Sequence, residues 1–183
     1  YNCFAPLEQI CVDFWGPINP TSIRGKKVIF VAICDVSSFV WTIPLASKDL
    51  APDKIKELIE YVRAKDTKII GEKIINTVRS DNEPIFRGAK WQKTLTELGV
   101  VESHSVPYTP QMNGVVERFM RTMSENIRSN LIGIDPLLWD YAAEYVAYNW
   151  NRLPRAKYAR APHLNNKTPV SYTHLTLPTT PYV

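Results

Sequence analysis

The sequence predicts a single α/β domain in which a five-stranded sheet is covered by helices. Three observations support this fold class. The chain has 183 residues, 45% hydrophobic and 22% charged, so one domain with a sizeable core is expected and wholesale disorder is excluded. Strand-type patterns fill most of the first half, whereas apolar residues at helical spacing fill the second half. The longest apolar run, residues 28–34, is far shorter than the roughly 18 residues that a membrane-spanning helix needs.

Five segments have the alternating or β-branched pattern of strands. Residues 10–14 alternate along the chain as in a half-buried strand. Residues 27–35 and 39–46 flank an Asp-Val-Ser-Ser turn signal, so we expect them to form an antiparallel hairpin after the first strand. Residues 74–80 and 100–105 predict two further strands.

Four segments have the periodicity of amphipathic helices. The first begins near Pro52, a residue that the first turn of a helix tolerates, and the second ends at Gly99, a natural C-terminal cap. The third begins at Val115, after which apolar residues recur every three or four positions. The fourth spans residues 136–151, and its Trp and Tyr side chains are expected in the core. Residues 107–114 contain two prolines and an Asn-Gly pair and therefore predict a loop.

The net charge of +4 is concentrated near the C-terminal end. All 18 acidic residues lie at or before Glu144, whereas five Lys and Arg residues follow it. A segment with charge of one sign can bind a polyanion such as nucleic acid, although an ordinary solvated terminus explains it equally well. The three cysteines have no CxxC or Cys/His spacing, so neither a disulfide framework nor a structural zinc site is indicated. A reducing, intracellular compartment is expected.

Three carboxylates are placed where they could share divalent cations. Asp13 lies on the first predicted strand, Asp81 directly follows the fourth, and Glu117 lies near the start of the third helix. Two Mg²⁺ ions about 3.5–4 Å apart need oxygen ligands from several chain segments, and strand ends and a helix start can supply them. The spacing alone does not distinguish these three acids from the others, most of which are expected to be solvated.

The sequence around these acids resembles the signature blocks of retroviral and retrotransposon integrase catalytic cores, those of copia-type elements above all. The blocks are VDFWGP at residues 12–17, RSDN at 79–82 and PYTPQMNGVVER at 107–118, with further similarity at 149–154 and 167–169. The resemblance implies a ribonuclease H-like fold, with a five-stranded mixed sheet flanked by helices. It also implies a two-metal polynucleotidyl transferase of the DDE superfamily that performs 3′-processing and strand transfer of retroelement DNA.

The same resemblance assigns roles to individual residues. Asp13, Asp81 and Glu117 fall on the family's catalytic, metal-binding triad, which implies two Mg²⁺ ions with Mn²⁺ as a substitute. Asn82 resembles the usual companion of the second acid and would orient its carboxylate, or it is simply a turn residue.

Two segments are candidates for nucleic-acid contacts. Arg121 and Ser124 lie on nearly the same helical face as Glu117, and similar positions in integrases face viral DNA. Alternatively, Arg121 pairs with Glu117 or Glu125 on its own helix. The segment that resembles the family's mobile active-site loop can also approach DNA, or its polar residues only form turns. Its candidate residues are Tyr108, Gln111 and Asn113.

The expected partners are retroelement DNA ends, target DNA and further copies of the chain in a homo-oligomer. Action in the nucleus is implied where the host is a eukaryote. One alternative is a related DDE transposase or nuclease that uses the same metals, against which the PYTPQMNGVVE block argues. Another is a catalytically silent DNA-binding or assembly domain of a decayed element, against which the presence of all three carboxylates argues.

Glu83 and the C-terminal segment depart from the family pattern. Glu83 stands where many relatives have Gly after the Asp-Asn pair, and this additional acid could crowd the metal site or point into solvent. From Val170 onward the resemblance stops, so residues 1–169 are expected to form the core and residues 170–183 a non-native or disordered tail. The family's zinc-binding and C-terminal DNA-binding domains have no counterpart in the sequence, so we expect a piece of a longer polyprotein.

Overall fold

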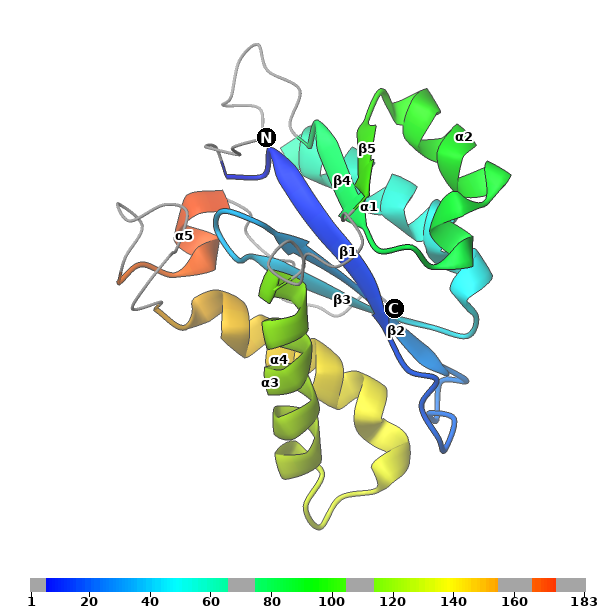
Figure 1. Ribbon diagram of the computed structural model, residues 1–183. Helices are drawn as coiled ribbons and strands as arrows, with labels where there is room; N and C mark the ends of the chain where they lie inside the picture. The colour runs from blue at the N-terminus through cyan, green and yellow to red at the C-terminus, as the bar shows by residue number, and fades with distance from the viewer. Residues whose placement is uncertain (1–5, 66–74, 105–113, 155–165, 174–183) are drawn as a thin grey trace.

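The computed structural model describes residues 6–65, 75–104, 114–154 and 166–173. These residues form a five-stranded mixed sheet with helices on both faces (Figure 1). This architecture confirms the predicted fold class.

The central strand of the sheet joins an antiparallel part to a parallel part. The strand order is β3-β2-β1-β4-β5. β1 (Gln9–Trp15), β2 (Val28–Cys34) and β3 (Val40–Leu45) pair as an antiparallel meander. β4 (Thr77–Ser80) pairs parallel with β1, and β5 (Val101–His104) pairs parallel with β4. β1 therefore has an antiparallel neighbour on one side and a parallel neighbour on the other.

Two pairs of helices cover the sheet (Figure 1). α1 (Ala51–Lys65) and α2 (Ala89–Leu98) lie on one face, and α3 (Gly114–Asn130) and α4 (Trp139–Arg152) lie on the other. The short α5 (Pro169–Thr173) lies beside α4. None of the described helices is long and apolar enough to cross a lipid bilayer. Among the described residues, single-turn 3₁₀ helices are formed by η1 (Lys48–Leu50), η2 (Pro84–Arg87) and η4 (Pro136–Leu138).

Alternation along β1 divides the core between the two faces. Val12 and Phe14 pack in the cluster on the α1 and α2 side, whereas Cys11 packs in the cluster on the α3 and α4 side. Asp13 lies two residues after Cys11 on the same strand, so its side chain is directed to the same face of the sheet. β2 is buried along its whole length because helices cover both of its faces, which explains its uninterrupted apolar sequence.

The prediction that the aromatic residues of the fourth helix lie in the core is wrong for its tyrosines. α4 packs on β3 with Ala143 and Ala147 buried, and these small side chains let the helix approach the sheet closely. The bulkier tyrosines are consequently directed away from the sheet. Their exposed fractions are 43% for Tyr141, 56% for Tyr145 and 44% for Tyr148.

α5 crosses the boundary that the sequence predicts between the core and the tail. Pro169 is buried, and Val170 packs partly buried against the core cluster on the α1 and α2 side. The structured part of the chain therefore extends beyond residue 169. Residues 174–183 lie outside the described residues, so a disordered tail remains a prediction for them.

Truncation after Thr173 is expected to leave the free energy of unfolding unchanged within about 0.5 kcal/mol, because the removed residues lack helical or strand periodicity. Truncation after Pro169 should instead cost about 1 kcal/mol, since the partly buried contacts of Val170 are lost. Urea denaturation of both truncated chains checks these values. A loss of several kcal/mol after Thr173 would show that the last residues are docked on the domain.

Candidate metal centre

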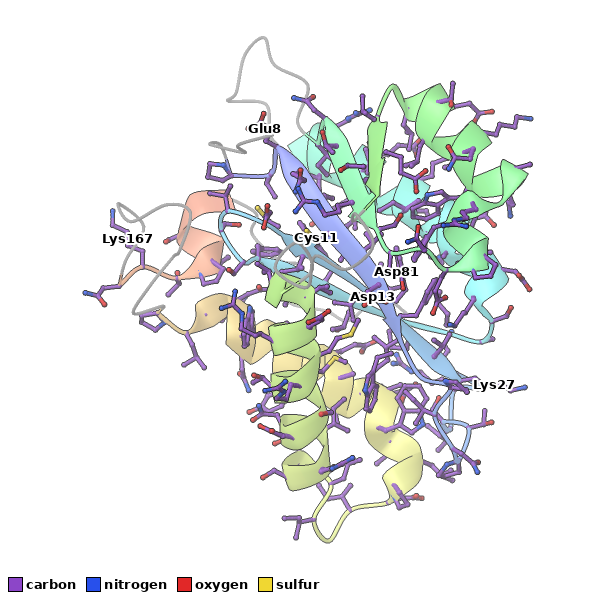
Figure 2. All side chains as sticks on the ribbon, viewed as in Figure 1. Glu8, Cys11, Asp13, Lys27, Asp81 and Lys167 are labelled. Atoms are coloured by element: carbon purple, nitrogen blue, oxygen red, sulfur yellow. The ribbon has the colours of Figure 1, made fainter. Side chains whose placement is uncertain are left out.

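Asp13 and Asp81 come together because the strands that carry them are parallel neighbours. The paired stretch of β1 and β4 ends where Cys11 lies opposite Arg79. Two residues farther along, the chain reaches Asp13 on one strand and Asp81 after the other. The carboxyl ends of parallel strands lie at the same edge of a sheet, which is where open α/β sheets usually bind ligands. Figure 2 shows the two side chains together beside β1.

A third carboxylate joins this pair. One side-chain oxygen from each of Asp13, Asp81 and Glu83 lies within 4.8 Å of the other two, and all three residues are partly buried. Carboxylate oxygens are the donors that Mg²⁺ and Mn²⁺ prefer in proteins. The donor set therefore fits a hard divalent cation.

Hydrogen bonds on both sides of Asp81 hold its segment in place. On one side, Ser80 Oγ donates to Glu102 Oε1 on β5 at 2.9 Å, and Trp91 Nε1 donates to the same oxygen at 2.9 Å. On the other side, the backbone N–H of Glu83 donates to Asp81 Oδ1 at 3.0 Å. The carboxylate of Asp81 is thus tied to its own backbone turn.

An aromatic contact links the two acidic segments. η2 begins directly after Glu83 with Pro84, whose restricted φ suits the first position of a helical turn. The fully buried Phe86 donates its N–H to the carbonyl of Glu83 at 3.1 Å. Its ring stacks on Phe14, with centroids 5.1 Å apart and planes 13° apart. Because Phe14 directly follows Asp13, this contact helps to keep both segments at a constant separation.

Burial and mutual repulsion change the acidity of the clustered carboxyls. Burial raises the pKa of Asp13 to about 6, with smaller contributions from Asp81, Glu83 and Glu117, while a backbone N–H acts in the opposite direction. Burial also raises the pKa of Asp81, while the N–H of Glu83 and the charge of Lys48 act against this rise. A cation bound among these oxygens would relieve the repulsion.

Without a divalent cation, the free energy of unfolding is expected to fall as the pH rises from about 4 to 6 through the contribution of Asp13. Its pKa is about 6 in the folded chain and about 3.9 in an unfolded chain. Over this interval the folded state holds a proton that the unfolded state has lost, so raising the pH destabilises the fold. Asp13→Asn should remove this contribution. Urea denaturation in EDTA across the interval compares the two proteins, and identical pH profiles would contradict the shift.

Lys48 lies at the outer side of the cluster. It belongs to η1, the turn between β3 and α1. Its Nζ donates to Glu83 Oε1 and Oε2, both at 2.8 Å, and lies 4.9 Å from the centroid of the Phe14 ring. The side chains of Lys48 and Glu83 are 35% and 28% exposed. One ammonium group therefore compensates part of the charge of three carboxylates.

The sequence matches retrotransposon polyproteins, although no protein-family model matches it. It is 30% identical over 174 residues to the retrovirus-related Pol polyprotein from transposon TNT 1-94 of Nicotiana tabacum. This match covers 92% of this chain and 13% of the relative. The sequence is 28% identical over 145 residues to the corresponding polyprotein from transposon 412 of Drosophila melanogaster, which covers 79% of this chain and 11% of the relative. The chain thus spans only a small part of the length of these relatives.

The structural comparison identifies the fold of the chain. The HTLV-2 integrase catalytic core domain, solved in complex with magnesium in a dimeric form, has a TM-score of 0.66 at 16% identity. The match covers 93% of this chain and 98% of that one. The chain has the fold of a retroviral integrase catalytic core, and its sequence is similar to retrotransposon Pol polyproteins. Its ribonuclease H-like fold is thereby confirmed.

Glu117 lies in the first turn of α3 and is exposed. Its charge contributes to raising the pKa of Asp13. Nevertheless, the carboxylate oxygens that lie within 4.8 Å of one another come from Asp13, Asp81 and Glu83, and not from Glu117. Residues 105–113, directly before α3, lie outside the described part of the chain. A ligand role for Glu117 therefore stays a prediction.

Asn82 is exposed, and its Oδ1 accepts a hydrogen bond from Arg87 at 2.6 Å. The backbone N–H that holds the Asp81 carboxylate comes from Glu83 instead. The expected orienting role of Asn82 stays untested.

The two residues of α3 that are predicted to contact DNA lie at the surface of the domain. Arg121 is exposed, and the partly buried Ser124 donates its Oγ to the carbonyl of Arg121 at 2.8 Å. Within the described residues, Arg121 forms no ion pair with Glu117 or Glu125, so the structure does not support the alternative that it is neutralised on its own helix. The loop candidates Tyr108, Gln111 and Asn113 lie outside the described residues.

Sequence reasoning missed Lys48 and left the direction of Glu83 open. Glu83 carries a usable signal, because it lies two positions after a predicted metal ligand. Lys48 carries none, since it is 35 residues away from Glu83 in the sequence and meets it only through the tertiary fold.

Proposed function

We propose that the chain is an integrase catalytic core of the DDE superfamily, a divalent-metal-dependent polynucleotidyl transferase that performs 3′-processing of retroelement DNA and strand transfer into target DNA. The observation that carries the proposal is the convergence of Asp13 and Asp81 at one edge of the sheet, with partly buried oxygens within 4.8 Å of each other. Partly buried carboxylates at this separation repel one another unless protons or a cation compensate them. Hard cations bound in such a way promote phosphoryl transfer.

The residues of the site have separate tasks in this proposal. Asp13 and Asp81 hold the metal through their carboxylate oxygens, and Glu117 adds a ligand from α3. Two Mg²⁺ ions, for which Mn²⁺ can substitute, would supply activation of the attacking hydroxyl and charge stabilisation at the leaving oxygen. The bond from the Glu83 N–H keeps the Asp81 carboxylate oriented. The pKa of about 6 leaves Asp13 mostly ionised, and thus able to act as a ligand, at pH 7.

DNA is proposed to pass the exposed face at the start of α3. Arg121 is exposed one turn beyond Glu117, and a guanidinium group there suits a phosphate. Ser124 and the loop residues Tyr108, Gln111 and Asn113 are the other proposed contacts. Because phosphate contacts release counterions, the affinity for double-stranded DNA should weaken with salt.

The proposed partners are the DNA ends of the element, target DNA and further copies of the chain. The comparison with the HTLV-2 core supports a homo-oligomer, since that protein was solved in a dimeric form. Action in the nucleus of a eukaryotic host is part of the same proposal.

The proposed function can be tested with a branched DNA that mimics a half-joined end. The purified chain is incubated with this DNA in Mn²⁺, in Mg²⁺ and in EDTA, and the labelled strands are separated by size. We expect joined strands with either cation and none in EDTA. Hydrolysis without joining would indicate a nuclease, and DNA binding by a folded chain without any reaction would indicate a silent assembly domain.

A further inference from the structure

Glu83 lies in one cluster of carboxylates with Asp13 and Asp81, and the family pattern assigns it no role there. We propose that Glu83 is a further carboxylate ligand of the cation held by Asp13 and Asp81, and that Lys48 is the residue that positions it. The inference deepens the proposed function and rests on it for the presence of the cation.

The first support is the distance between the oxygens. Ligand oxygens lie about 2.0–2.6 Å from Mg²⁺ or Ca²⁺, so two oxygens on one ion are at most about 4–5 Å apart. Side-chain oxygens of Asp13, Asp81 and Glu83 all lie within 4.8 Å of one another. One ion can therefore reach all three carboxylates with only small side-chain movements.

The second support is that the backbone of Glu83 is held from both sides. Its N–H donates to Asp81 Oδ1 at 3.0 Å, and its carbonyl accepts from the N–H of the buried Phe86 at 3.1 Å. Pro84 also restricts the backbone of Glu83, the residue before it, which has a φ of −59° and a ψ of 143°. The side chain of Glu83 consequently starts from a defined point beside Asp81, and its exposed fraction is 28%.

The third support is the geometry of the Lys48 contact. The ammonium group donates to both oxygens of Glu83 at 2.8 Å. A carboxylate has about four lone-pair sites, so this contact occupies two and leaves others for a cation. Lys48 is itself held against the Phe14 ring, and η1 is capped by Ser47, whose side chain accepts from the N–H of Asp49. A cation and Lys48 can therefore bind Glu83 together.

Calorimetric titration of the full chain with Mn²⁺ alone tests the ligand role. Glu83→Gln should raise the Kd for Mn²⁺ at least about tenfold, because a charged donor is replaced by a neutral one. Glu57→Gln is the matched control, since Glu57 also pairs with a lysine, Lys54 at 2.6 Å, but lies on the exposed side of α1. It should leave the Kd unchanged. The urea midpoint of each variant shows whether the fold is retained.

The outcomes separate this inference from the proposed function. Mn²⁺ binding that Glu83→Gln leaves unchanged overturns the ligand role alone and leaves an ordinary surface ion pair. A chain that binds Mn²⁺ through Glu83 but joins no DNA overturns the proposed function alone. A wild-type chain that does not bind Mn²⁺ overturns both.

A double-mutant cycle tests the positioning role of Lys48. Lys48→Met should raise the Kd for Mn²⁺ several-fold when Glu83 is present, because the carboxylate is no longer held towards the cluster, and Lys48→Arg should largely restore the affinity. In the Glu83→Gln background, Lys48→Met should cause no further weakening. Equal effects in both backgrounds, or tighter binding when Glu83 is present, would show that Lys48 acts only through its charge and would overturn the positioning role.

Discussion

Asp13→Asn and Asp81→Asn are each expected to abolish detectable DNA strand joining while the fold survives. Each change removes one negative charge from the site and weakens cation binding, and the loss of one such group should cost about 10²–10³-fold in rate or more. The stability at pH 7 in EDTA should stay equal or rise, because burial and neighbouring carboxylates raise the pKa of both acids and make their ionised forms unfavourable. Joining assays and urea denaturation measure the two effects separately.

Asp53→Asn is the matched control for these substitutions. Asp53 lies in the first turn of α1, where it pairs with Lys90 at 2.7 Å on the surface, so its loss should leave joining unchanged. Glu117→Gln should behave like the two aspartate variants if Glu117 completes the ligand set from α3. Joining that persists in Asp13→Asn or Asp81→Asn would remove these residues from the catalytic site.

Phe86→Ala is expected to cost about 3–5 kcal/mol in the free energy of unfolding, as is usual when a buried phenylalanine is truncated. Phe86 is fully buried, stacks on Phe14 and packs edge-on against Trp91, with centroids 4.8 Å apart. The change also removes the aromatic contact that links the Asp13 and Asp81 segments. Mn²⁺ affinity should therefore fall along with stability, even though the Phe86 side chain offers no oxygen to the cation.

Tyr145→Ala is the comparison for this truncation. Tyr145 is an aromatic residue of similar size that is 56% exposed on α4, so its removal should change the free energy of unfolding by less than about 0.5 kcal/mol. Urea denaturation of both variants gives the values. A Phe86→Ala chain as stable as Tyr145→Ala would show that the packing around η2 does not support the site.

The sheet could be predicted because its patterns are local. The alternation along β1 and the continuous apolar run of β2 directly reflect one-sided and two-sided burial. The start of the fourth strand was less predictable. Ile75 has a φ of +57°, which is outside the extended region, so β4 begins at Thr77 although the apolar sequence begins earlier.

The orientation of α4 could not be predicted from its composition. Its apolar residues include both alanines and tyrosines, and periodicity does not tell which set faces the sheet. The structure buries Ala143 and Ala147 and exposes Tyr145. Close approach to β3 decides the choice, and that approach is a property of the assembled sheet and not of the helix sequence.

The candidate site was predictable only where sequence position determines spatial position. Asp13 and Asp81 meet because β1 and β4 are parallel neighbours, which follows from the fold. The contact of Lys48 with Glu83 depends on where the turn after β3 passes the end of β4. No local pattern in the sequence encodes that approach.

The anomalous scattering of Mn²⁺ in crystals of the chain tests the central claim most directly, namely that Asp13 and Asp81 hold a divalent cation at the edge of the sheet. We predict a manganese peak within bonding distance of side-chain oxygens of both residues, and its loss in crystals of Asp81→Asn. A peak that avoids both carboxylates in the wild-type crystal, or one that Asp81→Asn leaves unchanged, would contradict the metal centre and the function proposed from it.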